Sequence, residues 1–288
     1  DVLTDCLKAN GFWIYLARYF SNYEGCFGIY TIPKDHTCEF EEFLNEIRNL
    51  GVARNIRFFW STCFHSVNLS SSWFNSQSNM WVFPWESWIS EISTEATQLP
   101  PTLKDPKEWP IRGDYVDVFI LKEMEKDARV DFTDIAKKLN MDPRGVQYHF
   151  RNHIVERGLM EGFKTTIFQF DRSLSDWLYF VFRFYSEDDM ARFASSRLDK
   201  PVRGPIGKVL GENALLALLY MPRVEFRKFV SSLSKIIRDG LLMDFEHVIL
   251  DISKSLQQTI SFEFFEDKKW TYEHDAHIQN LRKLVEQS

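Results

Sequence analysis

Runs of apolar positions separated by polar turns recur in two stretches of the chain, residues 25–64 and residues 215–252. Each stretch opens with an apolar run that ends in a proline, at Pro33 and at Pro222. Short apolar runs bounded by turn residues are typical of strands. Proline ends such a strand because it has no N–H to donate to a β-ladder. Both stretches therefore begin with a predicted strand.

An amphipathic segment follows each of these strands. Apolar residues recur at helical spacing up to a glycine, Gly51 or Gly240, which predicts a helix with a C-cap. A second apolar run then predicts a closing strand, at residues 56–60 and at residues 247–252. The shared order strand–helix–strand indicates an internal duplication.

The segments that precede the second stretch extend this pattern. Residues 178–185 predict a strand, residues 187–198 a helix, and residues 206–210 another strand. The complete order strand–helix–strand–strand–helix–strand is that of a ferredoxin-like fold.

The first copy begins later in the pattern. Residues 2–10 fit the end of its first helix, Gly11 the C-cap, and residues 12–20 the second strand. The first strand of this copy is missing, and residue 1 is Asp rather than Met. We therefore expect the native chain to extend upstream of Asp1.

The region between the copies is rich in proline and tryptophan. Residues 99–110 contain four prolines, which cannot continue a helix and favour an extended linker. A cluster of tryptophans precedes this linker: Trp73, Trp81, Trp85 and Trp88. We expect these side chains to pack between domains rather than to form a ligand cage.

Residues 113–163 carry a different pattern, which predicts three short helices. Helix one is expected from residue 114 to residue 126. Asp131 is the expected N-cap of helix two. Asp142 is the expected N-cap of helix three, which spans residues 143–156 and begins with a proline at its first position.

Gly158 predicts the end of helix three, and the chain from there to Phe170 offers two short strands for a wing. Three helices followed by a wing are typical of a winged helix-turn-helix. In this motif the recognition helix enters the major groove of DNA.

Helix three has an apolar face and a polar face. The apolar face is expected to pack on the other helices through Val146, Phe150 and Ile154. On the polar face, Arg can read guanine and Gln can read adenine in the major groove. The predicted DNA-binding residues of helix three are Arg144, Gln147, Tyr148 and Arg151. Lys137 and Lys138 on helix two are expected to contact phosphates.

These residues also resemble a known family. Two segments together resemble the helix-turn-helix of the Lrp/AsnC transcription regulators. They are Asp127-Ala-Arg-Val-Asp-Phe-Thr-Asp-Ile-Ala-Lys-Lys-Leu-Asn-Met-Asp142 and Gly158-Leu-Met-Glu-Gly-Phe163. The variant Val146-Gln-Tyr-His-Phe-Arg-Asn-His-Ile154 is most similar to the archaeal members. The resemblance implies a following ferredoxin-like domain that mediates dimerisation and often binds a small effector, and residues 175–265 are similar to that domain in pattern.

The chain departs from a simple member of this family in two ways. It carries a second ferredoxin-like copy in front of the winged helix-turn-helix. Its helix three is also about one residue longer between Val146 and Gly158, which affects the phase of the positions expected to contact bases.

The predicted fold is α+β, with two ferredoxin-like domains flanking a central winged helix-turn-helix. The predicted domains are residues 1–98 (ferredoxin-like, truncated at its N-terminus), 99–112 (linker), 113–172 (winged helix-turn-helix) and 173–288 (ferredoxin-like, with a C-terminal tail). If the duplication involved the whole unit, the native chain also carries the missing strand and a second winged domain upstream. The predicted function is sequence-specific transcription regulation, with double-stranded DNA as partner, a homodimer as the assembly and a small-molecule effector.

Composition and charge narrow the alternatives. The net charge of −6 excludes a protein coated with basic residues, such as a histone, yet leaves room for a local basic face. Residues 137–164 supply such a face, with six Lys or Arg against three Asp or Glu. The alternative is a ligand-sensing or protein-interaction scaffold that does not bind DNA, in which this face is simply solvated.

No apolar run approaches the roughly 20 residues that cross a bilayer, so no membrane contact is expected. Four cysteines without Cys-x-x-Cys spacing indicate reduced thiols in the cytoplasm. No catalytic triad, carboxylate pair or metalloprotease spacing stands out, so we expect neither an enzyme nor a cofactor.

Four side chains invite a metal hypothesis. His36 with Cys38, and Cys63 with His65, offer donors that zinc accepts. The spacing matches no known zinc finger, however, and cysteine is commonly a small buried hydrophobe. Two histidine pairs at helical spacing are likewise expected to pack or cap rather than to bind an ion: His149 with His153, and His274 with His277.

Overall fold

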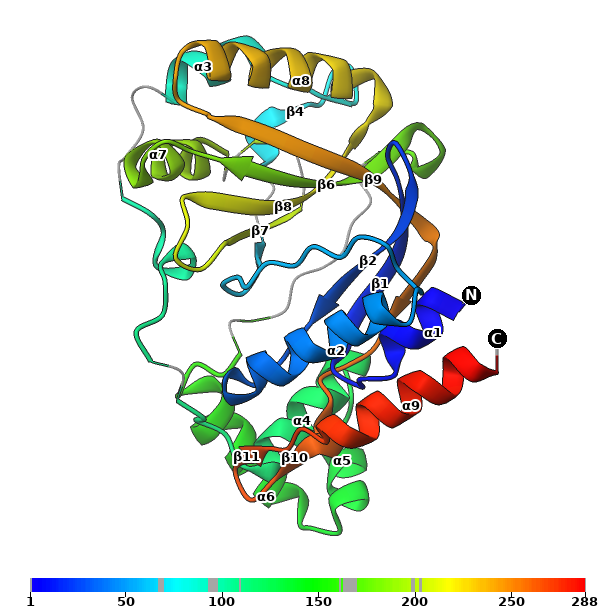
Figure 1. Cartoon of the computed structure of the whole chain (residues 1–288). Helices are drawn as coiled ribbons and strands as arrows, with labels where there is room; N and C mark the ends of the chain where they lie inside the picture. The colour runs from blue at the N-terminus through cyan, green and yellow to red at the C-terminus, as the bar shows by residue number, and fades with distance from the viewer. Residues whose placement is uncertain are drawn as a thin grey trace.

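The computed structural model describes residues 2–66, 70–92, 98–108, 110–160, 162, 170–197, 200–201 and 204–287. Strands from both copies of the duplicated pattern join in one antiparallel sheet of order β2-β1-β9-β6-β8-β7-β3 (Figure 1). Its strands are β1 (Trp13–Phe20), β2 (Glu24–Tyr30), β3 (His65–Ser66), β6 (Ser175–Arg183), β7 (Pro205–Lys208), β8 (Ala214–Pro222) and β9 (Asp244–Gln257).

The second copy occupies the centre of this sheet. Its elements follow the predicted order β6, α7 (Glu187–Arg197), β7, β8, α8 (Arg223–Arg238) and β9. Side chains alternate along β6, as they do in any strand. Phe180 and Phe182 join the main core beneath α7 and α8, whereas Val181 faces a smaller cluster on the opposite side.

The first copy forms the other end of the sheet. It consists of α1 (Val2–Lys8), β1, β2 and α2 (Thr37–Asn49), in the predicted order. Gly11 and Gly51 have positive φ angles of 78° and 73°, as expected of residues that end helices. Phe43 and Ile47 of α2 are buried against the C-terminal helix α9 (His274–Glu286), together with Leu281.

The long strand β9 joins the two copies. Its first part, from Asp244 to Leu250, pairs with β6. Its later part pairs with β1, with a bulge between the partners of Leu16 and Arg18. One strand of 14 residues therefore belongs to the hydrogen-bond ladders of both copies.

The closing strand predicted at residues 56–60 is wrong. This segment does not pair with β1 or β2 but crosses to the second copy, where Phe59 and Phe64 pack on the cluster around Val181. The backbone of Trp60 accepts a hydrogen bond from Leu210 N at 2.8 Å. The chain then pairs with β7 as β3. The physical reason is that β7 has an edge whose backbone groups need partners.

Two parts of the segment between the copies pack on the second copy, whereas residues 104–108 and 110–112 are exposed. Trp85 and Trp88 of helix α3 (Trp85–Ile92) are buried against α7 and α8, so these two tryptophans pack as predicted. Leu99 and Leu103, in the range predicted as linker, are buried in the same core.

The predicted helix-turn-helix lies at the other end of the molecule, beside the C-terminal residues (Figure 1). Its elements are α4 (Tyr115–Lys126), α5 (Phe132–Leu139), α6 (Pro143–Tyr148) and the continuation η4 (His149–Val155). The remaining short elements are η1 (Lys34–His36), η2 (Ser71–Trp73), β4 (Phe74–Asn75), β5 (Met80–Trp81), η3 (Pro101–Leu103), η5 (Arg172–Leu174), η6 (Phe262–Phe264), β10 (Phe265–Glu266) and β11 (Lys269–Trp270).

The domain ranges inferred from the sequence stay a prediction. The structure shows contacts between segments that belong to different predicted domains or copies. Helix α3 packs on the second copy, and α9 packs on the first. Among the described residues, no helix is long and apolar enough to span a membrane.

Candidate nucleic-acid interface

Three aspartates begin the three helices of the predicted reading unit, residues 114–156, and two of them, Asp131 and Asp142, were predicted as N-caps. Asp114 and Asp117 form a reciprocal capping box at the start of α4, in which each side chain accepts the other residue's backbone N–H. The side chains of Asp131 and Asp142 accept N–H groups in the first turns of α5 and α6. Asn140 closes α5 in the left-handed conformation, which asparagine tolerates.

The unit has its own small core. Ile135 and Val146 are fully buried there, as is Ile154. Phe150 is half-buried in the same cluster, against the ring of Phe132 at 5.1 Å. The apolar face predicted for helix three is therefore confirmed.

Helix three changes from α-helical to π-helical hydrogen bonding after Tyr148. The Glu156 N–H donates to Arg151 O at 3.1 Å, an i→i+5 bond. Such a turn contains one more residue than an α-helical turn. The helix is therefore wider at its C-terminal end than at its start.

The predicted base-reading side chains lie together on the outer side of helix three. Arg144, Tyr148 and Arg151 are exposed, and Gln147 is half-buried. Neither arginine forms an ion pair with another residue of the described chain, and the Gln147 amide has no hydrogen bond there. These donors are free to bind an external acceptor.

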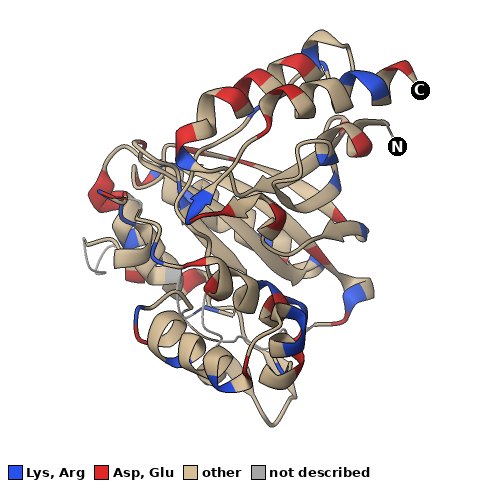
Figure 2. Ribbon diagram, turned by 90° about the horizontal axis from the view of Figure 1, so that it is seen from below, with Lys and Arg blue, Asp and Glu red and all other residues tan. Residues whose placement is uncertain are grey.

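The two lysines predicted to contact phosphates are engaged within the chain. Lys137 Nζ lies 2.9 Å from Asp134 Oδ1 on the surface of α5. Lys138 and Lys126 both donate to Glu123, whose side chain is buried. Although burial opposes it, the hydrogen bonds from the two lysines hold the pKa of Glu123 below its usual value. Basic and acidic residues are interspersed along the ribbon of the molecule (Figure 2).

The wing predicted between residues 159 and 170 falls largely outside the described residues. Gly158, which has a φ of 66°, ends helix three as expected. Nothing in the described part therefore tests the wing.

The first helix of the unit docks on the C-terminal part of the chain. Phe262 contacts the rings of Tyr115 and Phe119, with centroid distances of 4.6 and 5.0 Å. The Ile260 N–H donates to the Glu125 carboxylate at 2.8 Å. These contacts of α4 with residues 260–262 hold the reading unit against the rest of the chain, and helix three stays exposed.

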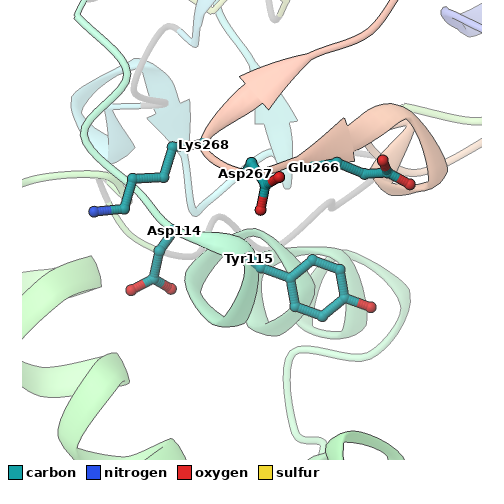
Figure 3. A pocket seen from close by; sticks show the side chains of 5 residues that line it. All are labelled: Asp114, Tyr115, Glu266, Asp267 and Lys268. Carbon is teal, nitrogen blue, oxygen red and sulfur yellow. The ribbon is translucent and has the colours of Figure 1, made fainter.

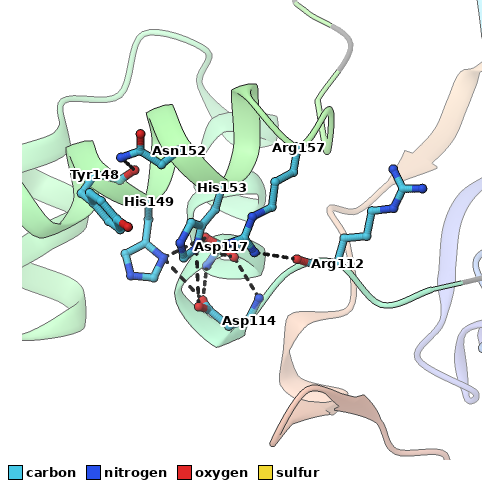
Figure 4. Close-up of polar contacts among 8 residues, drawn as sticks. All are labelled: Arg112, Asp114, Asp117, Tyr148, His149, Asn152, His153 and Arg157. Atoms are coloured by element: carbon cyan, nitrogen blue, oxygen red, sulfur yellow. Dashed lines mark hydrogen bonds and ion pairs between the residues drawn. The ribbon is translucent and has the colours of Figure 1, made fainter.

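A polar cluster beneath helix three was not anticipated as a site. The imidazoles of His149 and His153 approach the Asp117 carboxylate, with Nδ1–Oδ1 distances of 2.8 and 3.1 Å (Figure 4). Asp114 lies beside them, and Asn152 donates to the Tyr148 carbonyl of the π-helical segment. The spacing of the two histidines was visible in the sequence, but their approach to α4 depends on tertiary packing.

The cysteine–histidine pairs are not gathered into one site. His36 contacts Glu39 and stacks on Tyr272, and Cys38 is exposed. Cys63 is exposed and His65 lies in β3. Among the described residues, three or more potential metal ligands of the His, Cys, Asp or Glu type come together in one group, which contains none of these four.

The second pair at helical spacing lies on α9. His277 is buried between the rings of Phe12 and Tyr272. His274 lies 3.2 Å from Glu42 on α2. These histidines join α9 to the first copy, as packing residues would.

A shallow cavity of about 410 Å³ opens beside the start of α4. It is lined by Asp114 and Tyr115 and, on the β10–β11 hairpin, by Glu266, Asp267 and Lys268 (Figure 3). Three of its five side chains are carboxylates, so the cavity favours a cation over an anion.

Comparison with known proteins gives limited similarity. No family model matches the chain, and no curated protein matches it. Among solved structures, AsnC of Escherichia coli is 14% identical with a TM-score of 0.37, over 52% of this chain and 98% of that one. The transcriptional regulator NMB0573 of Neisseria meningitidis, in complex with L-Met, is 14% identical with a TM-score of 0.41, over 52% and 95%.

A third neighbour is the transcriptional regulatory protein PF0864 of Pyrococcus furiosus, a member of the AsnC family. It is 19% identical with a TM-score of 0.31, over 47% of this chain and 87% of that one. All three TM-scores lie below 0.5, so these likenesses carry no weight for the function of the chain.

Proposed function

We infer that the chain is a sequence-specific DNA-binding transcription regulator that reads the major groove with helix three. The observation that supports this function is the set of unengaged donors on the outer side of that helix, Arg144, Gln147 and Arg151. The opposite side of the same helix holds Val146 in the core, so the donors project from a fixed element. This arrangement suits direct reading of base edges.

The wider proposal follows the resemblance of residues 127–163 to the Lrp/AsnC regulators, in the variant most similar to archaeal members. It comprises a winged helix-turn-helix between two ferredoxin-like domains, a homodimer and a small-molecule effector. A two-fold dimer presents two reading helices to half-sites about one helical turn apart. In this proposal Lys137 and Lys138 exchange their intramolecular partners for phosphates when DNA binds.

The experiment starts from duplexes selected by the full chain from a random library. Fluorescence anisotropy then compares a selected duplex with its scrambled sequence, at about 50 and about 200 mM salt. We expect the selected duplex to bind at least about 10³-fold more tightly, and both to lose affinity with salt.

Arg238→Ala is the matched control variant. Arg238 is exposed at the end of α8, at the opposite end of the molecule from helix three (Figure 1). Its removal should leave both affinities unchanged. Equal binding of selected and scrambled duplexes by the parent chain would contradict the proposed function and favour the scaffold alternative.

A further inference from the structure

Four potential metal ligands converge where the first turn of α4 meets the π-helical part of helix three. They are Asp114, Asp117, His149 and His153, and one ligand atom of each lies within 4.8 Å of the others. The Asp117 side chain is fully buried, and the other three are half-buried. Figure 4 shows both imidazoles directed toward the two carboxylates.

The distances among these atoms fit a single tetrahedral ion. Zinc binds nitrogen and oxygen at about 2.0–2.2 Å, which places neighbouring tetrahedral ligands about 3.3–3.5 Å apart. The two imidazole Nδ1 atoms lie 2.8 and 3.1 Å from Asp117 Oδ1. His149 Nδ1 lies 3.6 Å from Asp114 Oδ1, and His153 Nδ1 lies 3.7 Å from Asp114 Oδ2. These separations lie on both sides of the ideal value but involve both Asp114 oxygens, so rotation of that carboxylate would bring one oxygen to the ion.

The charges of the cluster also favour a cation. Two carboxylates lie together, and no Lys or Arg of the described chain forms an ion pair with either. The nearby Arg157 donates instead to the Arg112 carbonyl, at 3.3 Å. Asp117 already accepts the Asp114 N–H, and a metal held together with the two imidazoles would balance the charges of both carboxylates.

The cluster adjoins a cavity that opens to solvent. Asp114 lines both the cluster and the acidic cavity of Figure 3, which is open beside the hairpin. Lys268 lines the same cavity, but Asp114, Glu266 and Asp267 outnumber it, so the cavity as a whole favours a cation.

We propose that Asp114, Asp117, His149 and His153 bind one divalent transition-metal ion of the zinc type. Each imidazole keeps its proton on Nε2 and presents the Nδ1 lone pair, and each carboxylate supplies one oxygen. Two imidazoles suit zinc better than Ca²⁺ or Mg²⁺, which prefer oxygen ligands. Four protein ligands leave no open position, so the role is structural rather than catalytic.

The ion would connect the start of α4 to the middle of helix three. Because α4 docks on Phe262 and its neighbours, the ion would fix the orientation of the base-reading side chains relative to the body. We therefore expect metal removal to weaken DNA binding. This consequence rests on the proposed function, whereas metal binding itself does not.

Metal binding is tested with Co²⁺ as an optical probe of the full chain after treatment with a chelator. One equivalent of Co²⁺ should give the visible absorption of a tetrahedral site with nitrogen and oxygen ligands, and Zn²⁺ should displace it. His149→Gln and His153→Gln should each weaken Co²⁺ binding at least about tenfold. His36→Gln should bind as the parent does, because His36 lies outside the cluster.

Several results would overturn the proposal. These are the absence of a tetrahedral spectrum, equal binding by both glutamine variants, or a thiolate-to-cobalt charge-transfer band that assigns the ion to cysteine. If a variant fails to fold, thermal unfolding of the parent chain still tests metal binding. A Zn²⁺ concentration about a hundredfold above Kd should raise the Tm of the parent by about 5 °C. Loss of the metal with unchanged DNA affinity refutes only the coupling, and metal binding without any DNA binding refutes only the proposed function.

Discussion

Lys208 Nζ lies 2.8 and 2.9 Å from the two carboxylate oxygens of Asp105. Lys208 is buried on β7, whereas Asp105 belongs to the range predicted as an extended linker. The same carboxylate also accepts the Gly211 N–H at 3.3 Å. This pair fixes the proline-rich segment to the edge of the sheet and gives it a structural role.

Asp105→Ala should lower the free energy of unfolding by about 1–3 kcal/mol, because it leaves a buried ammonium group without its carboxylate. Because Asp105 is partly exposed, this value lies below the roughly 3–5 kcal/mol that breaking a fully buried pair costs. Urea unfolding of the parent and the variant measures it. Asp239→Ala, at an exposed position after α8, is the control and should change stability little. Equal stability of all three proteins would show that the pair contributes nothing.

Arg144→Ala and Gln147→Ala should each reduce the affinity for the selected duplex by about 1–3 kcal/mol, the value of a good bidentate base contact. Binding of the scrambled duplex should change less, since it depends on phosphates. Anisotropy titrations of both duplexes measure the difference. If both variants discriminate as well as the parent, helix three is not the reader.

Lys137→Ala and Lys138→Ala should weaken binding to every duplex and reduce the salt slope by about one unit per lost phosphate contact. Only Lys138→Ala should also lower stability, by about 1 kcal/mol, because Lys138 shares the buried Glu123 with Lys126. Salt titrations and urea unfolding separate the two effects. An unchanged slope in both variants removes these lysines from the interface.

Acid should destabilise the docking of α9 through His277. Burial, with a smaller contribution from His274, lowers the pKa of His277 from 6.5 to about 4. Between these values the unfolded chain binds a proton that the folded chain does not, so stability is complete above pH 6.5 and falls as the pH falls toward 4. The loss from this group should reach about 2 kcal/mol at pH 5.

His277→Phe should remove that part of the pH dependence, since phenylalanine keeps the packing against Phe12 and Tyr272 without a titrating group. Urea unfolding at pH 7 and pH 5 gives the change for each protein. The parent should lose about 2 kcal/mol more than the variant. An equal loss in both would place the acid sensitivity elsewhere.

Local patterns predicted the helices well because their signals are short in range. Asp131 and Asp142 cap the helices that the sequence assigned to them. Gly51 and Gly240 follow the ends of α2 and α8 in the left-handed conformation. In each case the residue interacts with its own turn, so neighbouring sequence is sufficient.

Pairing between distant strands could not be predicted in the same way. The apolar run at residues 56–60 has the composition of a strand, but its partner is chosen by an unpaired edge at β7 far along the chain. The cluster at Asp117 could not be predicted for the same reason. The spacing of His149 and His153 is visible in the sequence, but the direction in which they leave the helix depends on the π-helical turn. Sequence identified these residue types but not their meeting point.

The shared strand β9 has a consequence for how the molecule comes apart. β9 belongs to the second copy, so separation of the copies would break its pairing with β1. The β1–β2, β6–β8 and β6–β9 pairs would remain. Because the β1–β9 ladder joins the two parts of the sheet, heat should melt both in one calorimetric transition. We therefore expect the two predicted copies to behave as a single cooperative unit, which scission between them would not divide into two stable fragments.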